Sequence, residues 1–442
     1  MRGMIDKLNK IAKPQDILAR YIVSKDTICF TFEFNHLQSY LSESDKIELS
    51  VACLQREAKL LCIIKESTEA ASTAHLDINL DPEDYFDKIE ALWEQKGVNL
   101  QTLWRLETVR IAKPWGSEIW YTGMEDRGIS TVAGMPLPWL CSIMPNRLKD
   151  DLRSTQVTQE KNLILLKILD PFPEIDRGDL YFELHSEKRE VYIVTSIDEA
   201  SWPNGEGQIR YGFNQEKLKT FETALEFKSA YLASVETYQS VRNEIDNFLD
   251  AQSEKTPIPS ELIAKEQKLK EIMYDFTALK RLKVGDVIHV HPYFPHSLQH
   301  GVRAIEFQTA HYERYILSFT QKVLTQNHWD TKTALRKVQT NLPLIETLKI
   351  IENSAGVLFE SIADFEEFSA YRLSLQRNAT YLPNTNAYTL VIGVKGVCLV
   401  EDSLGNAIHI RAEESFLIPP LTKEISIKGR TDNSVLLLAV PR

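Results

Sequence analysis

Short apolar segments separated by glycine and proline turns dominate the middle of this sequence, and they constrain its fold more than any other feature. Between Lys113 and about Phe213 these segments read KPWGSEIWYTG, LILLKIL, DLYFELHSEKREVYIVTS and QIRYGF. Many short strands separated by turns are typical of a β-barrel or a β-sandwich. We therefore expect a mainly β protein.

A segment with helical periodicity interrupts these strands once. Residues 214–280 are rich in Lys and Glu, contain no glycine and show helical periodicity, with a break at TPIPS (256–260). Segments typical of strands follow it, at LKVGDVIHVHPYFPHS and VRAIEFQT. We therefore expect the helical segment to interrupt one barrel rather than to separate two. We predict an insertion of two or more helices, with Ser260 as an N-cap.

The two ends of the chain differ from this middle region. Residues 1–105 contain the alternating segments TICFTFEF and KIELSVAC and a helical pattern at 82–96, so we predict a small α+β unit without evident chemistry. A helical linker is expected around 321–353, followed by strands and turns to the C-terminus. The predicted domains are 1–105, 106–345 with the insertion, and 346–442.

Composition limits the classes of partner. A net charge of −11 and a pI near 5.5 argue against nucleic acid or an anionic membrane surface, although a local Lys/Arg cluster could still bind a small anion. The five cysteines form no Cys-x-x-Cys pair, and we expect them to be reduced. The first residues lack the apolar stretch of a signal peptide, and no apolar run approaches a membrane span. We expect a cytoplasmic protein, either a monomer or a homodimer.

One segment carries a candidate metal site. Glu183 and His185 are two residues apart on a predicted strand, so they face the same side. Glu190 can join them if residues 186–189 form a turn. A fourth donor, His296, follows the second strand pair that begins at Gly285-Asp286. Two histidines and two carboxylates suit Zn²⁺ or another divalent metal.

Simpler explanations exist for each of these residues. A single strand histidine is more often a surface or core residue, and either glutamate could pair with Lys188 or Arg189. The combination of an acid/His pair, a turn, a glutamate and a distant Gly-Asp…His segment favours a metal site. Three other histidines near His296 leave the choice of the fourth ligand open: His289, His291 and His300.

Several segments, in this order, resemble the type I mannose-6-phosphate isomerases from Lys113 to the C-terminus. They are KPWGSEIW, LLKIL, ELHSEKREVYIV, GDVIHVHPYFPHS and AIEFQ, with the helical segment between the two halves. The region from FSAYRLSL to FLIPP is similar to that family's second barrel. The resemblance implies two cupin (jelly-roll) barrels, with the helical insertion and the metal in the first.

The resemblance also implies roles for individual residues. The metal ligands would be Glu183, His185, Glu190 and His296, and the residues around a sugar or sugar-phosphate substrate would be Lys167, Lys188, Glu306 and Arg314. The reaction would be an aldose–ketose interconversion through an enediol, which needs a base and a group that stabilises negative charge.

These substrate residues also have structural explanations. Lys167 lies in an apolar strand, where a charge needs a partner or a wet cavity. Lys188 in its turn is most simply solvated, and Arg314 could be an ordinary ion-pair partner. Trp115 is better explained as a core residue than as a platform for a sugar.

The sequence departs from the family in four places, one of which is the shifted Pro292, with the bulky Tyr293-Phe294 in the turn before His296. Glu183 replaces a glutamine, the loop from His185 to Glu190 is short, and Arg314 comes two residues early. Two alternatives to an isomerase therefore stay open: a cupin metalloenzyme of another class, such as an oxygenase, and a non-catalytic or regulatory carbohydrate-binding cupin. Bound Fe would favour an oxygenase, and sugar binding without turnover would favour a regulatory protein.

Overall fold

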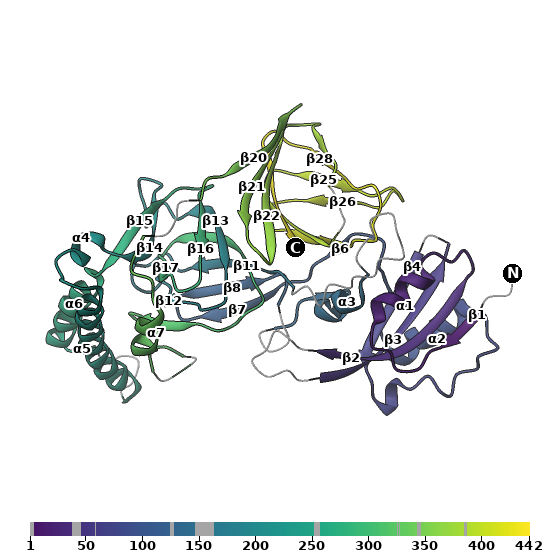
Figure 1. Cartoon of the computed structure of the whole chain (residues 1–442), viewed down its shortest axis with the longest axis horizontal. Coiled ribbons are helices and arrows are strands. Elements are labelled where there is room, and N and C mark those ends of the chain that lie inside the picture. The colour runs from purple at the N-terminus through teal and green to yellow at the C-terminus, as the bar shows by residue number, and fades with distance from the viewer. Residues whose placement is uncertain are drawn as a thin grey trace. The chain divides into compact units, whose positions relative to one another are not determined.

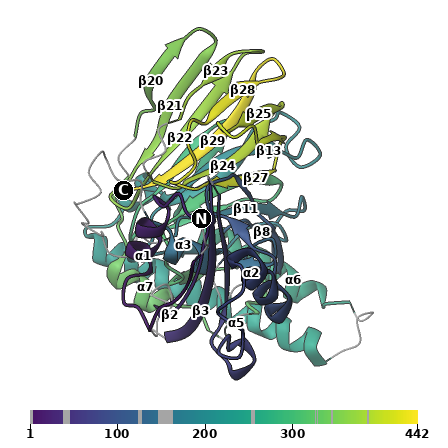
Figure 2. The same cartoon turned by 90° about the vertical axis from the view of Figure 1, so that its right-hand side faces the viewer.

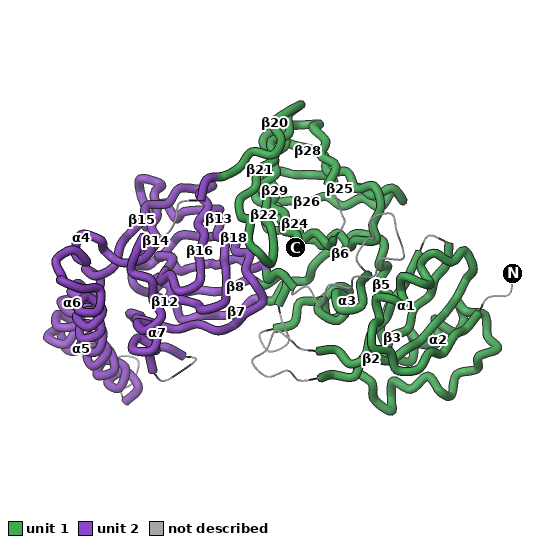
Figure 3. The backbone as a smooth tube through the Cα atoms, viewed as in Figure 1, with its two compact units in different colours: residues 1–109, 120–165, 348–442 green, residues 110–119, 166–347 purple. Residues whose placement is uncertain are grey.

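The chain forms two compact units in this computed structural model. The structure describes residues 4–37, 46–57, 59–123, 128–145, 163–251, 257–324, 326, 328–342, 346–383 and 387–442. Unit 1 comprises residues 1–109, 120–165 and 348–442, and unit 2 comprises residues 110–119 and 166–347 (Figure 3). The domain boundaries inferred from the sequence stay predictions.

Unit 2 is built on two β-sheets. The six-stranded sheet has the order β16 (Val287–Val290), β13 (Glu190–Ile197), β18 (Val302–Gln308), β11 (Leu165–Pro171), β8 (Gly116–Trp120) and β7 (Val109–Lys113). The five-stranded sheet has the order β15 (Thr277–Leu282), β14 (Gly207–Phe213), β17 (His296–Leu298), β12 (Phe182–Leu184) and β19 (Tyr315–Ser318). The antiparallel pairing and short strands agree with the expectation of a mainly β chain.

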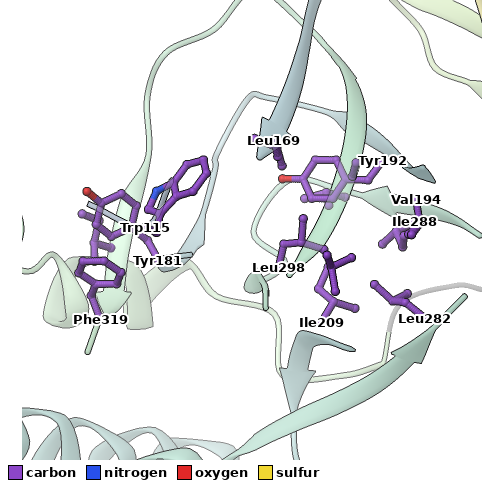
Figure 4. Packing of buried hydrophobic residues seen from close by; sticks show 14 residues of the cluster. Trp115, Leu169, Tyr181, Tyr192, Val194, Ile209, Leu282, Ile288, Leu298 and Phe319 are labelled. Atoms are coloured by element: carbon purple, nitrogen blue, oxygen red, sulfur yellow. The ribbon is translucent and has the colours of Figure 1, made fainter. Parts of the chain in front are cut away.

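The core of unit 2 lies between these sheets. Leu169, Val194 and Ala304 from the six-stranded sheet pack with Ile209 and Leu298 from the five-stranded sheet. Figure 4 shows part of this core, including Tyr181, Tyr192 and Trp115. The prediction that Trp115 is a core residue is confirmed, because it is 2% exposed.

Helices cover the other face of the five-stranded sheet. They are α4 (Gln215–Leu218), α5 (Ala224–Ala251), α6 (Ser260–Tyr274) and α7 (Thr331–Lys337). Phe182 and Leu184 of β12 pack in one hydrophobic cluster with Tyr231 of α5. The long helices α5 and α6 lie side by side (Figures 1 and 2). The helices predicted within 214–280 are therefore present, although β15 begins at Thr277, before the predicted end of the insertion.

Two details of the helix predictions are wrong. Ser260 is the first residue of α6, and Pro259 occupies the N-cap position without a side-chain hydrogen bond. In the region 321–353, α7 is the helix that the described residues contain, and β20 (Lys349–Ser354) begins where helix was expected. Thr256, part of the predicted break, lies outside the described residues, as do 252–255.

The N-terminal part of unit 1 is a five-stranded sheet with helices. Its strands are β1 (Met4–Lys7), β2 (Ile28–Leu37), β3 (Lys46–Arg56), β4 (Lys59–Glu66) and β5 (Val98–Asn99), and its helical segments are α1 (Pro14–Tyr21), η1 (Glu69–Ala71) and α2 (Pro82–Trp93). The alternating strands expected here are confirmed. Helix α2 ends at Trp93 rather than residue 96, because Glu94 adopts a left-handed conformation.

Unit 1 also contains a seven-stranded sheet and a four-stranded sheet. The seven-stranded sheet contains β20, β21 (Val357–Asp364), β22 (Phe368–Leu375), β29 (Ser434–Pro441), β24 (Thr389–Lys395), β27 (Ser415–Ile418) and β6 (Trp104–Arg105). The four-stranded sheet contains β23 (Thr380–Tyr381), β28 (Ser426–Gly429), β25 (Cys398–Glu401) and β26 (Ala407–Ile410). Their inner faces share one core, which includes Leu373, Val391, Val400 and Ile427.

A few shorter elements complete the described part of unit 1. They are β9 (Thr131–Val132), β10 (Met135–Pro136) and α3 (Leu137–Ile143). The five cysteines are free thiols, as expected. Among the described helices, none is both long and apolar enough to cross a membrane.

Candidate metal centre

The candidate ligands share the inner face of the two sheets of unit 2. On β12, Phe182 and Leu184 face the helices, so Glu183 and His185 face inward by strand alternation. Glu190 begins β13 with the same parity as the core residues Tyr192 and Val194. The expectation that Glu183 and His185 point to one side is therefore confirmed by the backbone.

Three of the four predicted ligands converge. One ligand atom from each of Glu183, His185 and His296 lies within 4.8 Å of the others. Glu183 is the direct cross-strand partner of His296 in the pairing of β12 with β17. Cross-strand neighbours bring their Cβ atoms to about 4.5–5.5 Å, close enough for both side chains to reach one ion.

Both histidines direct Nε2 toward this centre. His185 Nδ1 lies 2.8 Å from the main-chain oxygen of Glu313, and His296 Nδ1 lies 3.2 Å from the oxygen of Phe294. A carbonyl only accepts hydrogen bonds, so in the neutral His185 ring Nδ1 carries the proton and Nε2 keeps a lone pair. Burial, together with the Lys188 cation, lowers the pKa of His185 well below its usual value, and the ring is neutral.

Two atoms of the centre that could bind a metal have no hydrogen-bond partner. They are His185 Nε2 and Glu183 Oε2, both buried. An unpaired buried polar atom is costly, and a lone pair or carboxylate oxygen in this situation suits a cation. The residues present therefore fit a divalent metal ion bound by nitrogen and oxygen.

Glu190 lies beside this centre but is already engaged. Its Oε1 is 2.6 Å from Lys188 Nζ, and its Oε2 accepts a hydrogen bond from Tyr192 Oη at 2.7 Å. Its carboxylate is also 3.5 Å from His185 Nε2 and 3.2 Å from His296 Nε2. Burial alone would raise the pKa of Glu190, but the Lys188 cation outweighs it and keeps the carboxylate charged.

The three other histidines lie against different partners. His289 and His291 contact Glu346 at 3.3 and 2.9 Å, and His300 Nδ1 is 2.7 Å from Asp179. His296 is thus the histidine of this segment that the fold places beside Glu183 and His185.

A buried network of lysines and carboxylates adjoins the ligands. Lys167 Nζ lies 3.2 Å from Glu118 and 3.3 Å from Glu306, and Lys113 lies 2.9 Å from Glu118. Burial would raise the pKa of Glu118, but Lys167 and Lys113 lower it to about 2. Burial and the neighbouring Glu190 raise the pKa of Glu306 well above its usual value. Lys167 therefore has the partners that a lysine in an apolar strand requires.

The Lys188 side chain is buried, although the sequence alone was most simply explained by a solvated lysine in a turn. Its side chain is 8% exposed and paired with Glu190. Within the turn at 186–189 the Lys188 side chain points inward, whereas the Glu187 side chain is exposed. The solvated interpretation of Lys188 is therefore wrong.

A small cavity separates the ligands from the network. Its volume is about 30 Å³, and its lining includes Glu183, Glu190, Tyr192, Lys167, Glu306 and Arg314. The Arg314 guanidinium lies 4.7 Å from the centre of the Tyr181 ring, as a cation–π contact. All four predicted substrate residues thus lie at or next to this cavity: Lys167, Glu306 and Arg314 in its lining, and Lys188 through Glu190.

Sequence reasoning missed three residues here. Tyr192 lies two positions after Glu190 on one strand, so strand alternation could have placed it on the same face. Glu118 follows the Trp-Gly pair of KPWGSEIW without a signal of its own in spacing. Glu313 contacts His185 through a loop, and no periodic pattern indicates that contact.

Comparisons with known proteins show similarity of fold. No protein-family model matches the chain, and no curated protein matches its sequence. The crystal structure of mannose 6-phosphate isomerase from Bacillus subtilis matches with a TM-score of 0.53 and 14% identity, covering 77% of this chain and 99% of that one.

Two other solved structures match similarly. The apo form of mannose 6-phosphate isomerase from Salmonella typhimurium has a TM-score of 0.54 and 11% identity, and covers 77% of this chain and 99% of that one. A zinc-bound mannose 6-phosphate isomerase has a TM-score of 0.54 and 10% identity with the same coverages of 77% and 99%. This chain therefore has the mainly β, cupin fold of those isomerases.

Proposed function

We propose that this chain is a metal-dependent aldose–ketose isomerase of sugars or sugar phosphates. The observation that supports it is the convergence of Glu183, His185 and His296, with His185 Nε2 and Glu183 Oε2 buried and unpartnered. The fold shared with mannose 6-phosphate isomerases makes mannose 6-phosphate and fructose 6-phosphate the substrates to test before other sugars.

The metal in this proposal is Zn²⁺ or another divalent ion. Glu183, His185 and His296 would hold it, with Glu190 as the fourth ligand. A divalent ion bound there would act as a Lewis acid that polarises a sugar carbonyl and stabilises the charge developing on its oxygen. The neutral ring of His185 and the ionised carboxylate of Glu190 are the protonation states that such binding requires.

Glu306 is the proton carrier in this proposal. An aldose–ketose interconversion removes the proton from C2 of the aldose and returns a proton to C1, through an enediol, while a proton passes from the oxygen on C2 to the oxygen on C1. A carboxyl group with a raised pKa is better matched to proton transfer near neutral pH than an ordinary one. Lys167 holds the Glu306 side chain through their contact at 3.3 Å.

Arg314 is the group that would meet the anionic part of the substrate. Its guanidinium stacks on Tyr181 at the cavity, and a guanidinium can bind a phosphate with two hydrogen bonds. Binding there would orient the sugar chain with its reacting end toward Glu306.

The size of the cavity favours a second candidate, a regulatory cupin that keeps the metal centre without turnover. A volume of about 30 Å³ accommodates an ion with bound water but is smaller than a hexose. Catalysis on a hexose therefore requires the cavity to widen, whereas a regulatory role does not.

Elemental analysis and a phosphosugar assay on one preparation separate these candidates. The isomerase predicts about one Zn per chain and interconversion of mannose 6-phosphate and fructose 6-phosphate. Bound metal with sugar binding but no turnover of any tested sugar would favour the regulatory cupin, and bound Fe would favour an oxygenase. The full-length His296→Ala variant should lose both metal and turnover. The control is His328→Ala, because the His328 side chain is 65% exposed.

A further inference from the structure

The turn that joins two predicted ligands is held by a distant loop. Residues 186–189 connect His185 to Glu190, and they lie against the segment that follows β18. Arg189 N donates to Thr309 Oγ1 at 3.1 Å, and Thr309 N donates to the oxygen of Arg189 at 3.1 Å. This reciprocal pair fixes the Glu190 end of the turn.

Glu313 fixes the other end of the turn through its carboxylate. Its Oε1 accepts hydrogen bonds from Ser186 N, from Ser186 Oγ at 2.8 Å and from Glu187 N at 3.3 Å. Hydrogen bonds to a carboxylate are stronger than those between neutral groups. One side-chain oxygen therefore holds two successive backbone amides directly after His185.

The main chain of Glu313 acts on His185 itself. Its oxygen accepts the hydrogen bond from His185 Nδ1 at 2.8 Å. This contact fixes the tautomer in which Nε2 faces the centre with a lone pair. The carboxylate and the carbonyl of one residue thus set the position of the turn and the orientation of the ring.

We propose that Glu313 is a positioning residue of the metal centre, which holds His185 Nε2 aimed at the ion. This inference rests on the proposed metal binding. The Glu313 carboxylate keeps the loop in place, and the loop then presents its carbonyl to His185. Because Arg314 is the next residue and stacks on Tyr181, the same anchor also holds the substrate side of the cavity.

Variants of this contact should weaken metal binding in a graded order. Loss of a group that orients a ligand typically costs about 10–100-fold in metal affinity. Glu313→Ala removes all three side-chain hydrogen bonds and should reach that range. Ser186→Ala removes one of them and should have a smaller effect. Glu313→Gln keeps an acceptor oxygen and should recover part of the affinity.

Glu187→Ala is the matched control in the same turn. The Glu187 side chain is 71% exposed, and only its backbone amide contacts Glu313, so this variant should bind Zn²⁺ within about twofold of the wild type. Binding is measured on the full metal-free chain by competition with a chromogenic Zn²⁺ chelator. Thermal unfolding of the same metal-free samples shows whether each variant is folded.

Nitrogen NMR of the His185 imidazole provides a readout that a purely structural role would not move. The metal-free wild type should show a single tautomer with the proton on Nδ1, and Glu313→Ala should show a mixture. A folded Glu313→Ala chain that binds Zn²⁺ like the wild type and keeps one tautomer would overturn the proposal. If Glu313→Ala does not fold, unchanged affinity in Ser186→Ala would do so.

Zn²⁺ binding and sugar turnover of the wild type also separate this inference from the proposed function. A wild type that binds no Zn²⁺ would overturn the metal-dependent isomerase and the role of Glu313 at a metal. A wild type that binds Zn²⁺ without isomerising sugars would overturn only the proposed reaction. The order of Zn²⁺ affinities among the wild type and its variants would still decide the role of Glu313.

Discussion

Glu183 and His296 are direct partners across the antiparallel strands β12 and β17, although they are far apart in the sequence. The same pairing places both side chains on the inner face of the sheet, where His185 joins them. The candidate centre is therefore a product of strand register, and a shift of either strand by one residue would turn its ligand away.

Substitution of His296 should abolish metal binding without unfolding the chain. His296→Ala removes one of three converging donors, so bound Zn²⁺ should fall from about one equivalent to less than about 0.1 after dialysis. Elemental analysis of the purified protein measures this. His328→Ala, a change at an exposed histidine, should keep full occupancy. Full occupancy in His296→Ala would contradict the assigned ligand set.

Removal of Lys188 should destabilise the fold. Lys188→Ala leaves the Glu190 carboxylate, which is 1% exposed, without its cation at 2.6 Å. Breaking one side of a buried ion pair costs about 3–5 kcal/mol. Urea unfolding of metal-free protein measures the loss. The double variant Lys188→Ala/Glu190→Gln should recover part of it, and a loss below about 0.5 kcal/mol would indicate a solvated lysine.

The free energy of unfolding should fall in acid, partly because the Glu118 carboxylate becomes protonated. Its folded pKa is about 2, below the usual 4.5, because Lys167 and Lys113 outweigh the effect of burial. A lowered folded pKa contributes stability above the unfolded pKa, and this contribution is lost as pH falls from about 4.5 toward 2. Unfolding free energies at several pH values in this window measure it. Glu118→Gln should show a shallower pH dependence there, and an unchanged slope would contradict the assignment.

The Trp-Gly pair should not tolerate a side chain at its glycine. Gly116 has φ +151°, and a Cβ there would lie 2.2 Å from the main-chain oxygen of Asp170 on the neighbouring strand. Gly116→Ala should therefore destabilise the chain by about 3 kcal/mol or more, the sum of conformational strain and overpacking.

Gly205 provides the matched control for this clash. It has φ +67° and open space around its Cβ position, so Gly205→Ala should cost only the conformational term of about 1–2 kcal/mol. Urea unfolding compares the two variants. Equal losses would mean that the close approach to Asp170 does not limit residue 116.

Local patterns in the sequence determined the strands and the helices of the insertion. The alternation in TICFTFEF gives β2, and the parity of Glu183 and His185 puts both on one face of β12. Lys167 in an apolar strand required buried partners, and it has Glu118 and Glu306. These features follow from the period of a strand and from the cost of burying a charge, which both act over a few residues.

Tertiary structure decided which side chains meet. Spacing could not choose His296 over His289, His291 or His300, because that choice depends on the register of β17 with β12. It also could not show that Lys188 turns inward to Glu190, or that Glu313 contacts His185. Contacts between residues distant in sequence depend on how whole sheets and loops pack, and no local periodicity records that packing.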